Sequence, residues 1–406
     1  MSMRQLPFDN LRVLDFGWVW AGAVVGQILG DMGAEVIKVE SRRRLDPARQ
    51  GRPIVGDVPD PEQNPLFHNV NRGKLSTTLD LTHPRSRPLV KRLIEISDIL
   101  VENMTPEGIE KLSLDYERVK EINPSIIMLS YPVAGSYGPF RNIRGYAPTA
   151  TSLSGIDSLV GYPGEPALGM GGFYGDPNVG LHGAVSVLSA LWHRKKTGEG
   201  QYIDLSMWEA AVCTIGEAIM EYTMNGRILG SQGNVSINAA PSGVYPCKGD
   251  DKWICIVVKT EEEWNNLCQA MENPSWANEE RFSDLYQRVQ NQEALNELMS
   301  QWTIHYDHYE LAESLQQKGV AATPCLNTED RFLDQRFNER ENYVFVEHPV
   351  LGSEPVYGIP YKLSETPGQV KERAPLMGEH NDYVFGELLR LSPEEIEKLK
   401  QNKVIY

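Results

Sequence analysis

Short apolar runs typical of buried strands recur along the first half of the chain. They cover residues 11–16, 34–40, 76–81, 98–103, 125–131 and 201–206. Segments with apolar residues at helical spacing lie between several of them, as at 21–32 and 84–96. Strands that alternate with helices in this way form parallel sheets with right-handed crossovers. The pattern therefore predicts an α/β fold for this half.

The pattern changes in the second half. Residues 226–245 are rich in Gly, Ser and Asn and mark the expected domain boundary. Hairpin strands are predicted near 243–246 and 253–258, and helices fill 261–318. This order predicts a smaller α+β unit, which Pro324 closes.

Two further regions complete the pattern. Residues 325–406 carry a helix, strands near 343–362 and a charged helix that begins at Ser392. Residues 132–175 contain many Gly, Pro and Tyr residues and predict a long loop, which in a compact domain is usually functional. One helix is predicted over 208–224.

The end of that loop holds one carboxylate at the start of a predicted helix. Gly171, Gly172 and Gly175 let the backbone approach a ligand closely, and Asp176 comes directly before Pro177. Apolar residues then recur at helical spacing: Val179, Val185, Leu188, Leu191 and Trp192. An Asp before Pro commonly caps a helix, and the spacing alone favours that role. A carboxylate at a helix N-terminus also stays ionised and can attack an activated acyl carbon, so both roles remain open.

Composition narrows the classes of function. The 39 basic and 55 acidic residues give a net charge of −16, which argues against a broad nucleic-acid surface because phosphate binding needs basic residues. The five cysteines are scattered without C-x-x-C spacing, as expected for reduced thiols. Residues 1–7 lack the apolar core of a signal peptide, and no apolar run reaches about eighteen residues. These features predict a soluble cytoplasmic protein.

Other site chemistries lack their motifs. Gly17, Gly22 and Gly26 do not form G-x-G-x-x-G, which argues against a nicotinamide or flavin site. Neither a G-x-S-x-G elbow nor a phosphate-binding P-loop motif is present. His305 and His308 have a spacing seen in metal sites, but surface histidines of a helix explain it better, and no metal is predicted.

Basic residues follow the second predicted strand. Arg42, Arg43 and Arg44 come almost directly after it, and Arg49 and Arg52 follow in a loop rich in Gly and Pro. Arginines at the carboxyl end of a parallel strand are well placed to bind a phosphate. A solvated basic turn fits the same residues equally well.

Several short motifs occur in a fixed order over nearly the whole chain. They are Leu11–Asp15, Gly33–Glu40, Asn71–Lys74, Val101–Asn103, Gly175-Asp176-x-x-x-Gly180-x-His182, Lys196–Gln201 and Arg373–His380. Each motif is weak alone, but together, in this order and spacing, they are specific. The chain resembles the family III CoA-transferases, also called the CaiB–BaiF family.

The resemblance implies an α/β enzyme with two domains. A large Rossmann-like domain with a parallel sheet would use residues 1–225 and 331–406, and a small α+β domain would cover 226–330. Two chains would form an interlocked homodimer in which each threads through its partner. The substrates would be an acyl-CoA and a carboxylic acid, with no tightly bound cofactor, no metal, no nucleic acid and no membrane partner.

The resemblance gives Asp176 the role of nucleophile. It would attack the thioester to form an acyl-aspartyl anhydride, which CoA converts to an aspartyl-CoA thioester. The oxyanions need fixed donors, which the backbone N–H groups of the preceding glycines can offer. The CoA is expected to contact the following residues: Val19, Trp20, Ala21, Leu79, Asn103, Lys111, Arg144 and Tyr146.

Some positions depart from the formyl-CoA transferase branch of the family. Trp20 and Met104 stand where that branch has glutamine and phenylalanine. Ser41 stands where it has arginine, so the phosphate contact is expected to pass to Arg42 or a neighbour. The glycine-rich loop of that branch is absent near 231–245. These departures argue against oxalate or formate as substrates.

Two other functions within this family remain possible alternatives to CoA transfer. The racemase branch of the family exchanges the α-proton of 2-methylacyl-CoA and has a histidine where this chain has Tyr146, so transfer is favoured. A non-catalytic CoA-binding protein is the other alternative. A dicarboxylate substrate is a further hypothesis, because Arg141 and Arg144 can pair with a second carboxylate. His182, six residues after Asp176, is either a proton carrier or a packed helix histidine.

Overall fold

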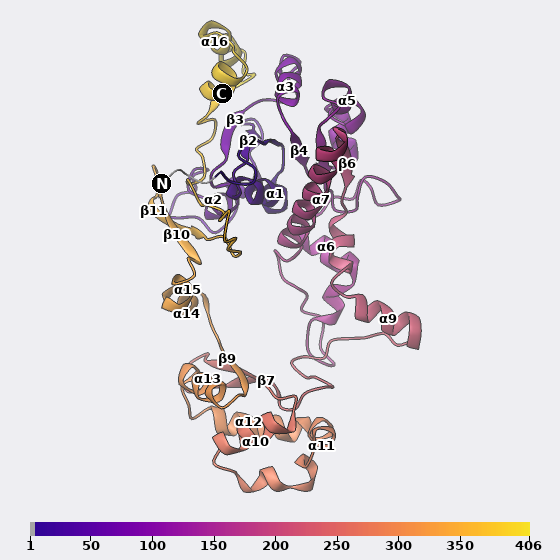
Figure 1. The fold of residues 1–406 in the computed structure, drawn as a ribbon, viewed down its shortest axis with the longest axis vertical. Helices are drawn as coiled ribbons and strands as arrows, with labels where there is room; N and C mark the ends of the chain where they lie inside the picture. Colours follow the sequence, from indigo (N-terminus) through magenta and orange to yellow (C-terminus); the bar gives the residue numbers. More distant parts are fainter. Residues whose placement is uncertain (1–4) are drawn as a thin grey trace. The chain divides into compact units, whose positions relative to one another are not determined.

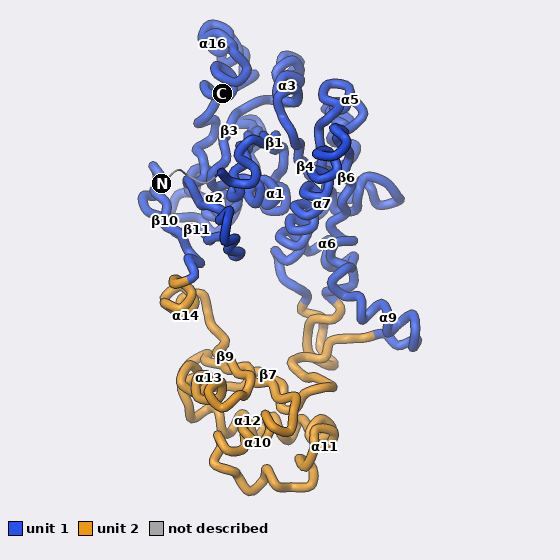
Figure 2. Tube along the Cα trace, viewed as in Figure 1, with its two compact units in different colours: residues 1–157, 169–228, 340–406 blue, residues 158–168, 229–339 orange. Residues whose placement is uncertain are grey.

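The chain, described over residues 5–406 in a computed structural model, forms two compact units. The large unit combines the residues up to 157 with 169–228 and 340–406, and the small unit combines 158–168 with 229–339 (Figure 2). The large unit is thus built from chain segments on both sides of the small one.

The boundaries of the small unit differ from those expected from the sequence, and its main segment begins at residue 229 instead of 226. Residues 158–168, expected in the large domain, belong to the small unit, where the Gly233 N–H donates to the Gly161 carbonyl at 2.9 Å. At its other end the small unit continues to residue 339 instead of 330. Arg336, within this continuation, lies with its guanidinium 5.1 Å from the ring centroid of Tyr309 in the small unit.

The large unit contains a parallel sheet of six strands. The strands are β1 (Arg12–Asp15), β2 (Glu35–Glu40), β3 (Leu75–Thr78), β4 (Ile99–Glu102), β5 (Ile127–Ser130) and β6 (Gln201–Asp204). Their order across the sheet is β3-β2-β1-β4-β5-β6, and every neighbouring pair is parallel. This is the strand order of Rossmann-type folds, which confirms the α/β prediction.

Alternate residues of the five strands other than β3 enter two separate apolar layers, one on each face of the sheet. Val13 and Val101 belong to one layer, whereas Leu14 and Leu100 belong to the other. The first layer includes residues of α1 (Val19–Asp31), α6 (Ala147–Ser154), α7 (Gly175–Thr197) and α8 (Met207–Val212). The second includes α3 (Ser86–Glu95), α4 (Pro106–Lys111), α5 (Tyr116–Ile122), the π-helical segment η5 (Asp382–Leu388) and α16 (Pro393–Gln401).

Helices α1 and α7 pack closely on one face of the sheet through glycines of α7 (Figure 1). A Cβ added at Gly180 would lie 2.5 Å from a methyl carbon of Val24. A Cβ added at Gly183 would lie 2.8 Å from Val25 and 3.1 Å from Leu129. These glycines therefore set how closely α7 approaches the middle of α1.

We expect Gly180→Ala to lower the free energy of unfolding by about 1–3 kcal/mol, because overpacking outweighs the better helix propensity of alanine. Gly30→Ala, in α1, is the matched control. A Cβ added at Gly30 would lie at an ordinary contact distance of 3.4 Å from Val36, so this substitution should raise the free energy of unfolding by up to about 1 kcal/mol. Urea denaturation measures both changes. Equal effects of the two substitutions would contradict the packing argument.

The small unit is built on a three-stranded antiparallel sheet, as predicted for an α+β unit. Its strands are β7 (Ser242–Pro246), β8 (Trp253–Val257) and β9 (Ala321–Cys325), in the order β7-β8-β9. Its main helices are α10 (Glu261–Ala270), α11 (Leu285–Gln290), α12 (Gln292–Thr303), α13 (His308–Gln317), α14 (Thr328–Leu333) and α15 (Gln335–Asn338). Pro324 lies within β9 and does not end the unit; an edge strand tolerates a residue without an N–H donor.

Some elements differ from the sequence-based predictions. The predicted loop 132–175 contains α6, and the predicted helix 208–224 is divided into α8 and α9 (Gly216–Asn225). Two further elements belong to the large unit: α2 (Pro65–Asn71) and an antiparallel hairpin of β10 (Tyr343–His348) and β11 (Gly352–Tyr357). Within residues 5–406, no helix is both long and apolar enough to cross a membrane.

Candidate active site

Four predicted CoA contacts follow the carboxyl ends of sheet strands. Val19 follows β1, Arg42 follows β2, Leu79 follows β3 and Asn103 follows β4. The strand order reverses at β1, between β2 and β4. Open α/β sheets bind ligands at such a reversal, beyond the carboxyl ends of the strands. The fold therefore favours this edge of the sheet as a binding site.

The turn between β1 and α1 is held by side chains of neighbouring strands. Asn103 accepts a hydrogen bond from the Trp18 N–H at 2.8 Å and donates to the Trp18 carbonyl at 3.0 Å. Asp15 accepts from the Gly17 N–H at 2.8 Å, and Lys38 donates to the Gly17 carbonyl. Since both polar groups of its amide are used in this way, Asn103 shapes the turn more directly than it offers atoms to CoA.

The glycine-rich segment before α7 reaches the same turn. The rings of Trp20 and Phe173 meet edge to face, with centroids 5.9 Å apart. Gly175 packs against the start of α6, where an added Cβ would lie 3.2 Å from Ala147. The structure thus brings together three segments that the sequence assigned to one site: the start of α1, the start of α6 and the residues around Asp176.

Asp176 lies in the first turn of α7 and is only 7% exposed. Tyr174 is the N-cap residue, and the cap makes no side-chain hydrogen bond, so Asp176 is not the cap predicted from the Asp-Pro pair. No hydrogen bond or ion pair to the Asp176 carboxylate is found among residues 5–406. Burial raises the pKa of Asp176 to about 7, so loss of hydration outweighs the helix N-terminus that was expected to keep it ionised.

Two other predicted CoA contacts, Leu79 and Lys111, differ in their exposure to solvent. Leu79 has no exposed surface, because it packs inside the second apolar layer, and it offers nothing to a ligand in this structure. Lys111 is exposed at the end of α4 and pairs with Glu107 at 2.6 Å, one helical turn earlier. A phosphate would have to compete with that carboxylate for the ammonium group.

The arginines after β2 have four different environments. Arg42 is exposed, and Arg43 pairs with Asp80 at 3.2 Å. The Arg44 guanidinium lies 4.5 Å from the ring centroid of Trp18. Arg49 is buried and makes two hydrogen bonds to Glu40, at 2.7 and 2.9 Å. The phosphate hypothesis therefore applies to Arg42 and its exposed neighbours, whereas Arg49 is structural.

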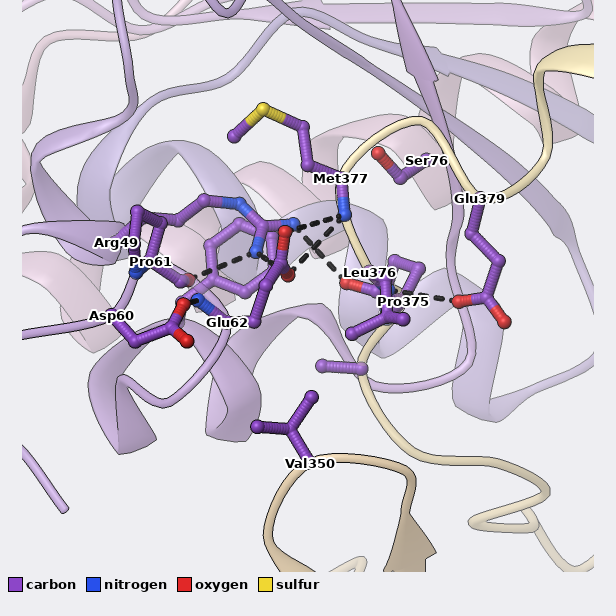
Figure 3. A network of polar contacts seen from close by, with 12 residues as sticks. Arg49, Asp60, Pro61, Glu62, Ser76, Val350, Pro375, Leu376, Met377 and Glu379 are labelled. Atoms are coloured by element: carbon purple, nitrogen blue, oxygen red, sulfur yellow. Dashed lines mark hydrogen bonds and ion pairs between the residues drawn. The ribbon is translucent and has the colours of Figure 1, made fainter. Parts of the chain in front are cut away.

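Arg49 also joins distant parts of the chain. It donates to the Pro61 and Pro375 carbonyls, both at 3.1 Å, and pairs with Glu62 at 2.8 Å (Figure 3). Glu62 in turn accepts a hydrogen bond from the Met377 N–H at 3.1 Å. These contacts hold the chain near residue 375 against the loop that follows β2.

The two arginines considered for a second carboxylate differ in partners. Arg141 pairs with Glu110 at 2.8 Å. Arg144 is exposed and shows no ion pair among residues 5–406. Tyr146, two residues later, is 64% exposed at the N-cap of α6. Arg144 and Tyr146 therefore present side chains to solvent, close in sequence to the α6 start that packs on Gly175.

The three histidines considered from the sequence lie in different environments. His182 is half-buried, and its Nδ1 lies 2.9 Å from the Asn178 carbonyl of its own helix, as a packed helix histidine does. His305 is exposed, but His308 is buried, contrary to the expectation of two surface residues.

A buried cluster of His68, His348 and Glu354 was not foreseen from the sequence. His68 Nδ1 lies 2.7 Å from a Glu354 carboxylate oxygen. His348 Nδ1 accepts long hydrogen bonds from the Val350 and Leu351 N–H groups at 3.3 and 3.4 Å, so the ring proton of the neutral form is on Nε2. The cluster joins α2 to the β10–β11 hairpin, with the ring centroids of His68 and His348 4.4 Å apart.

Known proteins share this arrangement of sequence and fold. A family model described as CoA-transferase family III matches residues 8–381. The chain belongs to the family III CoA-transferases. As an enzyme of this family, it transfers CoA between an acyl-CoA thioester and a carboxylic acid.

This CoA-transferase is similar to two proteins of Chloroflexus aurantiacus over its whole length. It is 32% identical to a succinyl-CoA–D-citramalate CoA-transferase, with 98% of each chain covered. It is 34% identical to a succinyl-CoA–L-malate CoA-transferase alpha subunit, with 100% of this chain and 94% of the relative covered. A crystal structure of a CaiB/BaiF family protein from Brucella suis has 30% identity and a TM-score of 0.87, covering 95% of this chain and 100% of that one.

Proposed function

We propose that the enzyme transfers CoA through covalent intermediates on Asp176. The observation that carries this proposal is a carboxylate that is buried in the first turn of α7, has no partner among residues 5–406, and follows the segment that contacts Trp20. A carboxylate stripped of hydration and of hydrogen bonds is a stronger nucleophile than one in water. If CoA binds beyond the carboxyl ends of the strands, its thioester would come within reach of Asp176.

The proposed reaction has four steps. A carboxylate oxygen of Asp176 attacks the thioester carbonyl, the C–S bond breaks, and an acyl-aspartyl anhydride and CoA thiolate form. The thiolate attacks the aspartyl carbonyl of the anhydride and releases the first acid as its carboxylate, which leaves an aspartyl-CoA thioester. The second acid attacks this thioester and expels the thiolate, forming a new anhydride. The thiolate then attacks the new acyl carbon and frees the Asp176 carboxylate.

Trapping with hydroxylamine tests this assignment directly. The enzyme incubated with succinyl-CoA should give a hydroxamate at Asp176, because hydroxylamine attacks both the anhydride and the thioester. Mass spectrometry of the peptide that contains residue 176 measures the modification. Enzyme incubated with free CoA and no acyl donor is the control and should remain unmodified. A transferring enzyme that never shows the hydroxamate would overturn the covalent mechanism.

We infer that both acids exchanged by this enzyme are small dicarboxylates. The two Chloroflexus relatives are named for succinyl-CoA with citramalate or malate, and all three acids carry a second carboxylate. A distal carboxylate needs a cation that no other group occupies. Arg144 fits that role, because it is exposed and lacks an ion pair among the described residues, whereas Arg141 is paired with Glu110.

Arg144→Gln should therefore raise the KM for a dicarboxylic acceptor about tenfold, the effect expected when one charge-assisted hydrogen bond is lost. The KM for a monocarboxylic acid of similar size should change little. Arg141→Gln is the matched control and should leave both values near wild type. Steady-state kinetics with both acceptors measures the difference. If the Kd for free CoA, which carries no carboxylate, rises instead, Arg144 contacts CoA and not the second carboxylate.

We propose that a second copy of the chain covers the outer face of α7. Apolar side chains 46% to 63% exposed follow this face at helical spacing: Leu181, Val185, Leu188 and Trp192. Helix α9, also in the large unit, has no buried residue although it carries apolar side chains. Folded monomers rarely expose contiguous apolar surfaces of this extent. An interlocked homodimer would bury this face.

Light scattering after size exclusion should give twice the chain mass of 45.6 kDa. Leu188→Asp should shift the protein toward a monomer, because it places a charge in the apolar face. Ser314→Asp, at an exposed serine of α13 in the small unit, should leave the mass unchanged. A monomeric wild-type protein would exclude the homodimer and leave a different subunit as the partner of this face.

A further inference from the structure

The first residue of α1 has an unusual backbone conformation. Val19 has φ of +59°, in the left-handed region, although its side chain is branched at Cβ. Such a conformation is costly for valine and is kept only where the surroundings impose it. Trp20, which contacts Phe173, is the next residue. Whatever holds Val19 in this conformation also sets the direction in which Trp20 leaves the turn.

Asp46 makes the contact that holds Val19. One carboxylate oxygen, Oδ1, accepts hydrogen bonds from the Val19 N–H at 3.0 Å and from the Ala48 N–H at 2.9 Å. Asp46 is only 4% exposed, so water does not compete for these bonds. It lies in the loop after β2, where it caps the short helix η1 (Pro47–Arg49). Asp46 therefore connects two loops that emerge from neighbouring strands.

The charge of Asp46 is balanced by Lys38. The Lys38 ammonium lies 3.6 Å from Oδ2 of Asp46 and also donates to the Gly17 carbonyl. Both side chains are almost fully buried. Oδ2 has no hydrogen-bond partner in the described chain, so the Asp46 carboxylate is positioned by its contacts to Val19 and Ala48 and by the charge of Lys38. A buried ionised group with such defined contacts fixes geometry more than it adds stability.

We propose that Asp46 is a positioning residue for CoA: it holds Val19 in the left-handed conformation and so preforms the start of α1 for the ligand. This inference rests on the proposed function, because it takes Val19, Trp20 and Ala21 as the contact surface for CoA. Without the bond from Asp46, Val19 would relax to a negative φ, and Trp20 would move from its place beside Phe173. The affinity for CoA would fall, whereas the affinity for the carboxylic acid would not change.

The test compares Asp46→Ala with wild type by calorimetric binding of free CoA and by steady-state kinetics. We expect the Kd for CoA and the KM for acyl-CoA to rise about tenfold or more, and the KM for the acid to stay unchanged. Asp46→Asn keeps a neutral acceptor for the Val19 N–H and should raise both CoA values about threefold. It provides the same comparison if the alanine variant does not fold. Asp307→Ala, which removes a carboxylate that also accepts two backbone N–H groups in the small unit, is the control for a general loss of stability.

A second substitution separates positioning from structural support. Glycine adopts positive φ without steric cost, so adding Val19→Gly to Asp46→Ala should recover most of the lost CoA affinity. Loss of the charge partner of Lys38 would not be repaired by a glycine at position 19. The proposal is overturned if folded Asp46 variants bind CoA normally, or if Val19→Gly restores nothing.

These experiments separate failure of the positioning role of Asp46 from failure of the covalent mechanism on Asp176. If Asp176 is never modified but the Asp46 variants still bind CoA weakly, the covalent mechanism fails and the positioning role stands. If wild-type enzyme does not bind CoA at all, both fail.

Discussion

Asp176→Asn is expected to abolish CoA transfer and, at the same time, to make the protein more stable at pH 8. Activity should fall by at least about a thousandfold, because the amide cannot form the anhydride. Stability should rise because the wild-type carboxylate is buried without a partner in the described chain, and its pKa is raised to about 7. Asparagine has nearly the same shape and no charge to desolvate.

The direction of the pH dependence follows from proton binding in the two states. Between pH 4 and pH 7 the folded protein keeps the Asp176 proton, whereas the unfolded chain, with a normal carboxyl pKa near 3.8, has released it. The wild type therefore loses stability as the pH rises through this window, by about 1.4 kcal/mol per pH unit at most. The variant lacks this loss, so its advantage should be a few kcal/mol at pH 8 and should shrink toward pH 4.

Urea denaturation of both proteins at pH 8 and pH 6 measures this difference. Burial also raises the pKa of Glu102 to about 7, but Glu102 is present in both proteins and cancels in the comparison. Asp284→Asn, at the N-cap of α11, is the matched control: its side chain caps the Gln287 N–H at 2.8 Å, and asparagine caps equally well. It should change neither activity nor stability by more than about 1 kcal/mol. If the Asp176→Asn protein transfers CoA at a normal rate, Asp176 is not the nucleophile.

The wild-type pH–rate profile provides an independent check on Asp176. The nucleophile must be ionised, so kcat/KM should rise with pH and level off above a pKa of about 7. The same ionisation that activates the enzyme thus weakens the fold. A profile without any limb between pH 6 and pH 8 would contradict the buried, unpartnered state of this carboxyl group.

Arg49→Met is expected to destabilise the large unit by about 3–5 kcal/mol, the usual result when one member of a buried ion pair is removed. The substitution leaves Glu40 buried at 5% exposure without its main charge partner, and the Pro61 and Pro375 carbonyls without a donor. Arg49 also lies 3.6 Å from the ring centroid of Phe67, and methionine would replace only part of that contact. The unfolding free energy from urea titration measures the loss.

Arg281→Met is the control for this prediction. Arg281 pairs with Glu279 at 2.7 Å, but both side chains are exposed, at 44% and 45%. Exposed pairs contribute only about 0–1 kcal/mol, so the control should be nearly neutral. Comparable losses from both substitutions would show that burial of the Arg49 network (Figure 3) is not the source of its effect.

The sequence predicted most of the parallel sheet and the helix that begins at Asp176. The strands were recognisable because both faces of a parallel sheet are buried, which leaves continuous apolar runs such as those of β4 and β5. Helix α6 was missed because Gly145 and Pro148 at its start resemble a loop. The break between α8 and α9 was missed because apolar residues continue through it, and those of α9 are exposed instead of packed.

The sequence could not predict those features of the site that depend on contacts between residues far apart in the chain. Arg42 and Arg49 look alike in the sequence, but only the fold shows that Glu40 and Glu62 enclose the second. The Asp-Pro pair correctly marked the start of α7, yet the depth at which Asp176 is buried depends on neighbouring helices. Asp46 carries no motif, and its role follows from a contact with Val19, 27 residues earlier.

The division of the large unit into separate segments has a consequence for how the protein is made. The edge strand β3 is completed by the late segment around residue 380: the His380 N–H donates to the Ser76 carbonyl at 2.9 Å, and Asn381 accepts from the Thr78 N–H at 2.8 Å. A ribosome must translate the whole stretch 229–339 before it reaches that segment. The small unit can therefore fold on the nascent chain before the large unit is complete. Until then, the first strands of the large unit lack these contacts and are exposed to aggregation.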